Sequence, residues 1–339
     1  MIDRRGTFII AEAGVNHNGS LDMAKRLVEE AKRAGADSIK FQTFRADRLA
    51  SIDARKASYQ EETTPVGESQ YTMLKSLELS GDDHIELMDH CRKNDIMFLS
   101  SPFDEESADL LEHLGVTAFK IPSGEITNLP FLTHLAGKRK PLILSTGMST
   151  LGEIEEALAT FRSAGNSDVS LLHCVTEYPA PFDEINLNAL ISIRTAFGLP
   201  TGYSDHTRGI EIAIAAVALG AVIIEKHFTL DSTLPGPDHR ASIEPLEFKR
   251  MVTAIRNVER AMGDGIKRPA ACELRNIPIV RRSLVAARDI RAGETITSSD
   301  IAVKRPGTGI FPRDLNAVIG MRATSLIPRD TVLTWGHFK

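Results

Sequence analysis

Short apolar runs recur along most of the chain and alternate with longer stretches in which apolar residues are spaced three and four apart. The short runs predict buried strands, and the longer stretches predict amphipathic helices. The expected strands are Phe8–Ala11, Ser38–Phe41, Ile96–Leu99, Ala118–Ile121, Leu142–Leu144, Val169–Leu172, Thr201–Tyr203 and Ala221–Ile224. The clearest expected helices are Leu21–Ala34, Asp82–Asn94, Glu105–Leu114, Gly152–Ala164 and Ile210–Leu219. Eight strand–helix units predict parallel strands and match the usual size of a (β/α)₈ barrel.

Residues typical of helix ends support these boundaries. Thr150 and Glu153 form a capping-box pattern at the start of one helix. Glycines that end helices follow four of the helical runs, at Gly35, Gly115, Gly165 and Gly220. An open doubly wound sheet would require a G-x-G-x-x-G turn after its first strand, and the segment 14–19 lacks it. The barrel is therefore favoured.

Polar side chains stand at the carboxyl ends of all eight expected strands, where barrel enzymes place their active sites. In chain order they are Glu12; Lys40 and Gln42; Ser101; Lys120, Ser123 and Glu125; Ser145; His173, Glu177 and Tyr178; Ser204, Asp205 and His206; Glu225, Lys226 and His227. Residues two apart on a strand project to the same side, so Lys40 and Gln42 pair, as do Glu225 and His227. The pattern predicts a polar site at the barrel mouth.

The chemical groups at the strand ends limit the classes of ligand and reaction that the site suits. Two cations and several hydroxyls suit a phosphate and a carboxylate, and they come from Lys40, Lys120, Ser101, Ser123, Ser145 and Ser204. His206 and His227 end neighbouring strands, so they either converge on one divalent metal or serve as hydrogen-bonding groups. Acid or base candidates are Glu12, Glu125 and Asp205. A Schiff-base lyase centred on Lys120 or Lys226 is an alternative, because a barrel lysine can condense with a carbonyl.

Composition adds limits on location and partners. Apolar residues make up 42% and charged residues 25%, as in ordinary globular proteins. No apolar run approaches the roughly 20 residues that span a bilayer. The three cysteines are widely separated, which favours a reducing compartment, and we expect the cytoplasm and no membrane association. The chain carries a net charge of −5 and no basic run, so we expect no nucleic-acid partner.

The charge is unevenly distributed. Residues 281–339 hold ten Lys/Arg and five Asp/Glu, a net of +5, and subtraction from the total leaves −10 for residues 1–280. A basic module beside an acidic body favours docking between them or attraction of an anionic ligand.

Several motifs, in order along nearly the full chain, resemble the bacterial sialic acid (nonulosonate) synthase family. They are AEAGVNHNG at 11–19, KFQT at 40–43, KIPSGE at 120–125, LSTGM at 144–148, EYP at 177–179, YSDHT at 203–207, EKHFT at 225–229 and GPDH at 236–239. The segments RSL at 282–284, DIRAGE at 289–294 and KRPG at 304–307 are similar to that family's antifreeze-like (SAF) domain. The expected organisation is α/β: a TIM barrel over 1–265, a linker over 266–280 and a small β-rich antifreeze-like (β-clip) domain over 281–339.

The resemblance implies condensation of phosphoenolpyruvate with an open-chain, N-acetylated mannose-like sugar, giving a nine-carbon 2-keto acid and phosphate. It implies that His206 and His227 bind Mn²⁺ or Mg²⁺, and that the two lysines and the four serines named above bind phosphoenolpyruvate. The implied sugar contacts are Gln42, Glu125, Tyr178, Asp238 and Arg305. Glu12 would orient or deprotonate the attacking water. Arg305 would reach into the barrel of a partner subunit, which implies a domain-swapped homodimer.

Within the family, GPDHRASIEP at 236–245 and EITN at 125–128 are similar to a branch that includes N,N′-diacetyllegionaminate synthases. That branch uses a 6-deoxy, 2,4-diacetamido sugar, and the product is expected to be N,N′-diacetyllegionaminate or N-acetylneuraminate, with pseudaminate as an alternative. A methyl and a hydroxymethyl group can be distinguished by small packing changes, so the residue pattern alone leaves the sugar open. A carbohydrate-binding or ice-binding protein is a further alternative; it would place the function in residues 281–339.

Overall fold

A computed structural model of the protein describes residues 6–65 and 67–339. The chain divides into two compact units, Met1–Gly263 and Asp264–Lys339, which are described separately. No described helix is long and apolar enough to cross a membrane.

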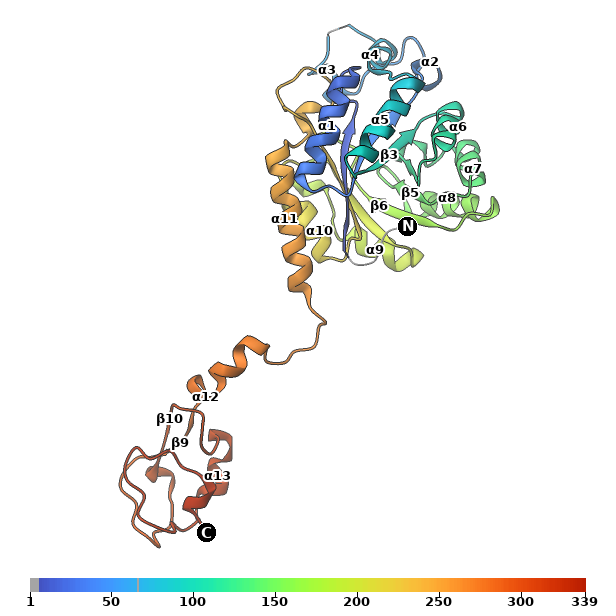
Figure 1. Ribbon diagram of the computed structural model, residues 1–339. Coiled ribbons are helices and arrows are strands. Elements are labelled where there is room, and N and C mark those ends of the chain that lie inside the picture. Colours follow the sequence, from blue (N-terminus) through green and yellow to red (C-terminus); the bar gives the residue numbers. More distant parts are fainter. Residues whose placement is uncertain (1–5, 66) are drawn as a thin grey trace. The chain divides into compact units, whose positions relative to one another are not determined.

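The first unit is built around a parallel sheet of eight strands in the order β3-β2-β1-β8-β7-β6-β5-β4 (Figure 1). Contact between β3 and β4, the two ends of this order, closes the sheet into a barrel. The strands are β1 (Phe8–Gly14), β2 (Ser38–Thr43), β3 (Met97–Pro102), β4 (Phe119–Ile121), β5 (Leu142–Ser145), β6 (Val169–His173), β7 (Thr201–Asp205) and β8 (Ile223–His227). The predicted (β/α)₈ barrel is confirmed.

A helix follows each strand and packs on the outside of the barrel (Figure 1). These helices are α1 (Leu21–Ala34), α5 (Gly81–Lys93), α6 (Glu105–Leu114), α7 (Leu129–Gly137), α8 (Leu151–Ser163), α9 (Ala189–Phe197), α10 (Glu211–Ala218) and α11 (Pro245–Met262). The predicted capping box of Thr150 and Glu153 starts α8. Gly35 and Gly115 end α1 and α6 in the left-handed conformation, while Gly165 and Gly220 follow one residue after the last cap of α8 and α10.

Alternate residues of each strand face opposite sides of the barrel wall. The outward residues join the helices in one large core, whereas the inward ones form a small apolar layer: Ile10, Leu99, Ala118, Ile143, Leu172 and Ile223. This layer is crowded, because a Cβ on Gly202 would lie 2.4 Å from the carbonyl oxygen of Ile223 and 2.7 Å from the Leu172 side chain. The lower half of the barrel is therefore a packed core, and any site must lie above it.

The connection between β2 and α5 is longer than the others. We call residues 45–80 the insertion segment; it contains α2 (Ala46–Leu49), α3 (Ser58–Glu61) and α4 (Gln70–Leu77). Its two ends are joined, since the backbone N–H of Ala46 donates to the Glu78 carboxylate at 2.6 Å. Its apolar side chains form a separate small cluster in which Met73 and Leu77 are buried with Val15 and Phe44.

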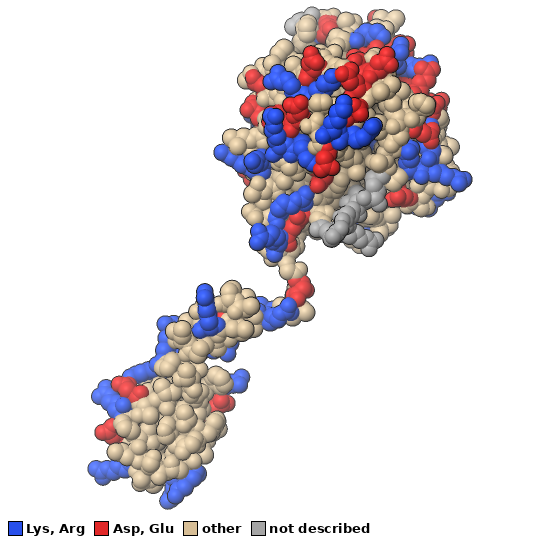
Figure 2. All heavy atoms as spheres, in the orientation of Figure 1, with Lys and Arg blue, Asp and Glu red and all other residues tan. Residues whose placement is uncertain are grey.

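The second unit contains little helix. β9 (Ser283–Ala286) and β10 (Ile301–Lys304) pair antiparallel, and isolated bridges connect further extended segments. Ten buried apolar residues form its core, among them Leu284, Ile290 and Leu333. The preceding residues form α12 (Ile277–Val280) and a 3₁₀ turn, Ala271–Asn276, with no buried residue in either. Many Lys and Arg side chains lie at the edge of this unit in the view of Figure 2, in agreement with its positive charge. The expected β-rich module is confirmed.

Candidate active site

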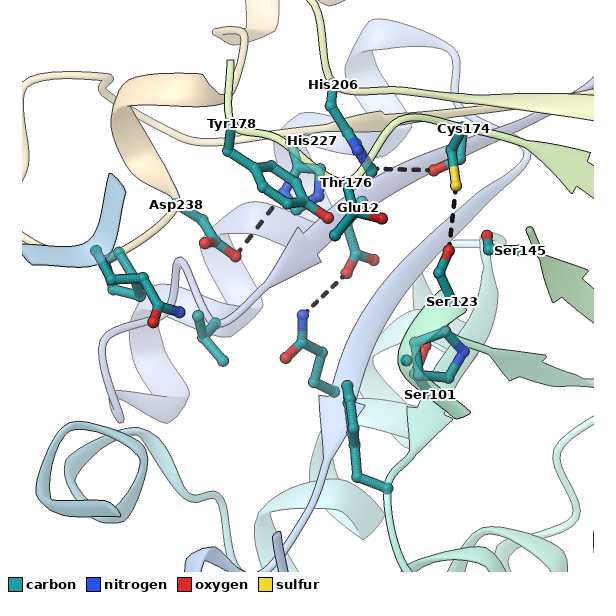
Figure 3. Close-up of a pocket in the computed structure, with 18 of the residues that line it drawn as sticks. Glu12, Ser101, Ser123, Ser145, Cys174, Thr176, Tyr178, His206, His227 and Asp238 are labelled. Carbon is teal, nitrogen blue, oxygen red and sulfur yellow. Dashed lines mark hydrogen bonds and ion pairs between the residues drawn. The ribbon is translucent and has the colours of Figure 1, made fainter. Parts of the chain in front are cut away.

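A pocket of about 310 Å³ opens among the carboxyl ends of the barrel strands. Most of the residues proposed for the site from sequence line it together: Glu12, Lys40, Gln42, Ser101, Lys120, Ser123, Ser145, Tyr178, Ser204, His206, His227 and Asp238. These side chains therefore converge on one pocket. The contact that each makes with a ligand stays a prediction. In the view of Figure 3, Glu12 lies between a serine-lined side and a side that carries His206, His227, Tyr178 and Asp238.

Two buried lysines and two buried carboxylates form a compact charge cluster. The Nζ of Lys40 lies 2.6 Å from Oε2 of Glu12 and 3.9 Å from Oε2 of Glu225. The Nζ of Lys120 lies 3.3 Å from Oε1 of Glu225. The four side chains are at most 4% exposed. Buried charges require partners, and each ammonium here has a carboxylate beside it while still facing the pocket.

The cluster sets different protonation behaviour for its members. Burial raises the pKa of Glu12 to about 7, although the Lys40 ammonium opposes that shift. Burial alone would raise the pKa of Glu225, but Lys120 and Lys40 lower it to about 2. Burial also lowers the pKa of Lys120, with Glu225 opposing the change. Two neighbouring carboxylates with separated pKa values suit different tasks, Glu12 exchanging protons and Glu225 holding a constant charge.

Hydroxyl groups from four strand ends add neutral donors beside the lysines. Ser101 accepts a hydrogen bond from Lys40 at 3.1 Å, and Ser204 donates to Glu225 at 3.0 Å. Among the described residues, the buried hydroxyls of Ser145 and Thr176 have no hydrogen-bond partner. A Cβ on Gly147 would lie 2.3 Å from Oγ1 of Thr176, so glycine keeps this part of the pocket open. Unpartnered buried donors are costly unless a ligand satisfies them.

The two histidines lie next to each other, with ring centroids 5.3 Å apart. His206 donates from Nδ1 to the carbonyl oxygen of Val175 at 2.5 Å when that nitrogen carries the proton, which leaves Nε2 as a lone-pair donor for a metal. Nδ1 of His227 is buried without a hydrogen-bond partner and lies 3.9 Å from the Asp238 carboxylate. Burial lowers the pKa of His206 to about 4 and that of His227 well below its usual value. Both imidazoles are thus neutral near pH 7, the form that binds metals.

The described residues contain no cluster of three or more His, Cys, Asp or Glu side chains arranged to hold a metal ion. The two imidazoles lie beside each other at the pocket and would be the protein ligands of a divalent cation, with its other positions open to water and substrate oxygens. That donor set fits the open Lewis-acid site expected from sequence.

The pocket side beside the histidines combines carboxylates, an amide and aromatic rings. The Oε1 of Glu12, the Nε2 of Gln42 and the Oδ2 of Asp238 would all lie within 3.5 Å of a Cβ on Gly14, so these three groups meet around that glycine. Burial raises the pKa of Asp238 to about 6. Tyr178 packs against His206 at a centroid distance of 4.2 Å.

Asp205 was proposed as an acid or base, and the structure does not bring it into the pocket. Its fully buried carboxylate lies 2.8 Å from the Nζ of Lys226 and accepts hydrogen bonds from the N–H and hydroxyl of Thr207. The reason is strand alternation: Ser204 and His206 face the pocket, so Asp205 faces the helices. The same pairing turns Lys226 away from the pocket and leaves Lys120 as the lysine available for Schiff-base chemistry.

Two further predicted residues are not among those that line the pocket. Glu125 directly follows two lining residues but is half-buried, and its carboxylate accepts a hydrogen bond from the Asn128 amide at 2.8 Å. Arg305 belongs to the second unit, where it is exposed and its Nε donates to the Val280 carbonyl at 2.9 Å. Their sugar contacts stay predictions.

Several lining residues were not assigned a role from sequence. Glu225 was noted at a strand end, and its spacing from His227 was the signal that it shares the pocket. Cys174 follows β6, and its thiol lies 3.2 Å from the Ser123 hydroxyl. The insertion segment contributes a third group, in which Tyr59 packs on Tyr178 at 5.0 Å. No local motif marks the insertion segment as part of the site, because its position depends on packing.

Fold and site together define a TIM-barrel enzyme whose mouth gathers buried lysines, carboxylates, hydroxyls and two histidines. The NeuB family model matches residues 27–267 and the SAF domain model matches residues 281–339, so the chain belongs to the NeuB family and ends in a SAF domain.

Relatives support the same assignment over nearly the whole chain. An N,N′-diacetyllegionaminic acid synthase of Campylobacter jejuni is 54% identical over 96% of this chain and 98% of its own. A protein of the same name from Legionella pneumophila is 48% identical over 98% of this chain and 94% of its own. A solved N-acetylneuraminic acid (sialic acid) synthetase from Leptospira borgpetersenii, crystallised with citrate, is 36% identical with a TM-score of 0.71, covering 80% of this chain and 90% of that one.

Proposed function

We propose that the protein condenses phosphoenolpyruvate with an N-acetylated, mannose-like sugar to a nine-carbon 2-keto acid and phosphate, and that its product is N,N′-diacetyllegionaminate. The two relatives at 54% and 48% identity both carry that product in their names, which favours it over N-acetylneuraminate and over pseudaminate. The corresponding sugar is 2,4-diacetamido-2,4,6-trideoxymannose. We place the reaction in the cytoplasm.

The observation that carries this proposal is the buried cluster of Lys40, Lys120, Glu12 and Glu225 beside unpartnered hydroxyls. Phosphoenolpyruvate has a phosphate and a carboxylate on a three-carbon frame, and two ammonium groups set apart by carboxylates match two separate anions. Ser145 and Thr176 would donate to the phosphoenolpyruvate oxygens and so satisfy their own hydroxyls. A ligand without acceptor oxygens would leave these donors unpaired.

The sugar lies, in this proposal, on the side of Gln42, Asp238 and Tyr178. His206 and His227 would hold Mn²⁺ or Mg²⁺ there, and the metal supplies Lewis-acid polarisation of the sugar aldehyde when bound. The Val175 carbonyl keeps the lone pair of His206 directed into the pocket.

The reaction forms a bond between the phosphoenolpyruvate methylene carbon and the aldehyde carbon. Water then adds at C2, and the C–O bond to phosphate breaks, leaving a ketone at C2. One water proton ends on the former aldehyde oxygen, which becomes a hydroxyl, and the other ends on the departing phosphate. Glu12 is the group that takes the proton of this water, because burial sets its pKa to about 7 and the residue lies beside Lys40 in the pocket. A base with a pKa near the working pH is the most effective one.

The decisive experiment measures phosphate release from phosphoenolpyruvate with Mn²⁺, using 2,4-diacetamido-2,4,6-trideoxymannose or N-acetylmannosamine as the sugar. We expect release that requires both metal and sugar. Release without metal, together with covalent trapping of a keto acid by borohydride, would replace this proposal by the Schiff-base lyase. No release with either sugar would reject the synthase function.

We also propose a homodimer in which Arg305 of one subunit contacts the sugar in the barrel of the other. The +5 charge of residues 281–339 and the −10 charge of the rest are complementary, which supports such docking. Mixing inactive His227→Ala subunits with inactive Arg305→Ala subunits tests it, because one of the two sites in a mixed dimer would then be intact. Recovery of up to half the activity per mixed dimer is expected, and no recovery in dimers that demonstrably mix would contradict the shared site.

A further inference from the structure

One face of α4 borders the pocket at every turn. Gln70, Met73, Leu74 and Leu77 all line the pocket, and their spacing of three and four residues places them along one side of the helix. With Leu49, Val15 and Phe103 they give the pocket an apolar side that the strand ends lack. We call Leu49, Met73, Leu74, Leu77, Val15 and Phe103 the apolar wall.

The apolar wall has a fixed base. Met73, Leu77 and Val15 are buried in a cluster with Phe44, and the Phe44 and Phe103 rings meet edge to face at 6.1 Å. Leu74 and Leu49 are only half-buried, so they rest on this base while their side chains contribute to the pocket surface. They are the wall residues that can be changed without opening the buried cluster.

The other lining residues of the insertion segment are amides and a phenol. Gln60 and Gln70 can donate and accept hydrogen bonds, and Tyr59 lies over Tyr178 beside the histidines. An acetamido group presents one N–H, one carbonyl and one methyl, so amides next to an apolar wall match it in all three parts. Phosphoenolpyruvate is small and has two anionic groups, a phosphate and a carboxylate, so its chemistry does not match this surface.

We propose that the insertion segment determines sugar choice, with the apolar wall contacting methyl groups at the end of the sugar remote from the aldehyde. This inference rests on the proposed synthase function. The 2,4,6-trideoxy sugar carries a C6 methyl and a C4 acetamido group, whereas N-acetylmannosamine has hydroxyls at both positions. A hydroxyl placed against the wall would lose its hydrogen bonds to water without replacement. One such group in an apolar pocket typically changes kcat/KM by about 10–200-fold.

The test compares kcat/KM for the two sugars in wild type, Leu74→Asn and Leu74→Met. We expect wild type to prefer the 2,4,6-trideoxy sugar by at least about 10-fold, within the range for one apolar contact. Leu74→Asn offers a hydrogen-bonding partner in the wall and should reduce this ratio at least threefold. Leu74→Met keeps an apolar side chain of similar volume and should leave the ratio within twofold of wild type. Leu49→Asn repeats the change at the second half-buried position.

The same measurements distinguish a wrong account of sugar choice from a wrong synthase function. If phosphate is released but wild type uses both sugars equally, the apolar wall does not select, and the inference is wrong. The same holds if both Asn variants lower kcat/KM for the two sugars by the same factor. If wild type releases no phosphate with either sugar, the synthase function fails first and this inference with it.

Discussion

The barrel strands carry two inward layers of buried side chains that differ in chemistry. The lower layer is the apolar set Ile10, Leu99, Ala118, Ile143, Leu172 and Ile223. Two residues further along the same strands, the upper layer is Glu12, Ser101, Lys120, Ser145, Cys174 and Glu225, all of which line the pocket. A shift of two residues moves a side chain one step up the same face of the strand, so each of these six strands supplies one residue for packing and one for chemistry.

This difference shows which inward residues of the barrel serve stability and which serve function. Burial of the lower layer removes apolar surface from water and stabilises the barrel. The upper layer, together with the neighbouring Lys40, buries two ammonium groups and two carboxylates, which costs desolvation that their mutual attraction offsets only in part. The lower layer therefore contributes more to folding than the intact charge cluster above it, and neutral truncations in the two layers should divide their effects between stability and activity.

The largest functional effect is expected just above the upper layer, at His227. We predict that His227→Ala abolishes phosphate release and leaves the fold intact, because the imidazole is a proposed metal ligand and its Nδ1 has no hydrogen-bond partner to lose. Circular dichroism and thermal unfolding check the fold, and titration with Mn²⁺ checks the metal. Metal-dependent turnover in this variant would remove His227 from the metal site.

A second prediction concerns Glu225, the carboxylate of the upper layer that stays ionised because Lys120 and Lys40 lower its pKa. Glu225→Gln removes the carboxylate 3.3 Å from Lys120. Breaking a buried pair typically costs about 3–5 kcal/mol, and we expect kcat/KM for phosphoenolpyruvate to fall by about 10²-fold or more, the range for losing one preorganised electrostatic contact.

Glu225→Gln should also change the pH dependence of kcat/KM in a defined direction. Burial already lowers the pKa of Lys120, and the Glu225 carboxylate opposes that shift. Without the carboxylate the Lys120 pKa falls further, so the ammonium loses its proton at a lower pH. The alkaline limb of kcat/KM for phosphoenolpyruvate should therefore move to lower pH. Ser204→Ala is the matched control: it removes a hydrogen bond to Glu225 but keeps both charges, so its alkaline limb should stay in place.

A pair of variants on one strand compares the two layers directly. Leu99→Ala in the lower layer should lower the free energy of unfolding by about 2–5 kcal/mol, the usual cost of such a cavity, and leave kcat/KM of the folded enzyme within a few-fold. Ser101→Ala, two residues on, removes a hydrogen bond to Lys40 and should cost about 1 kcal/mol of stability or less, while kcat/KM falls about 10-fold. Urea unfolding and phosphate release measure the two effects. Equal losses of stability would mean that the layers are not separated.

Much of this division was predictable from the sequence. The eight apolar runs, the helix caps and the polar strand ends are local signals, and the two-residue period correctly paired Lys40 with Gln42 and Glu225 with His227. The same period, applied to β7, places Asp205 on the face opposite Ser204 and His206, where it pairs outside the pocket with Lys226. Adjacent polar residues at a strand end therefore do not form one group.

The insertion segment was not predictable in the same way. Its helices are short, and only tertiary packing turns the face of α4 with Leu74 toward the pocket. The sequence leaves residues 45–80 open between a lid or substrate loop and ordinary packing of Tyr59, Gln70 and Tyr71. Tyr59 and Gln70 line the pocket, and the apolar face of α4 that lines it was not predicted. Local patterns describe which face of a helix is apolar, and they do not say what that face meets.

The smallest predicted effect tests whether the insertion segment acts only through the sugar side of the pocket. Lys56 is buried within it, and its Nζ donates to the Thr64 hydroxyl and to the Pro65 carbonyl, both at 2.7 Å, and lies 3.7 Å from Glu68. These contacts hold the part of the segment that carries Tyr59 and Gln60. Lys56→Met keeps the length of the side chain and removes the contacts, so KM for the sugar should rise about three- to tenfold, equivalent to roughly 1 kcal/mol for lost hydrogen bonds.

The turnover number and KM for phosphoenolpyruvate should change less than twofold in Lys56→Met, because the side chains proposed to bind the anion come from the strands and the turns after them, not from the insertion segment. Lys75→Met is the control: this lysine is exposed on α4 and pairs with Glu78 at the surface, where an ion pair contributes little. If Lys56→Met instead lowers the turnover number with KM for the sugar unchanged, the insertion segment acts on the upper layer itself. Catalysis by the strand residues and sugar recognition by the insertion segment would then not be separate.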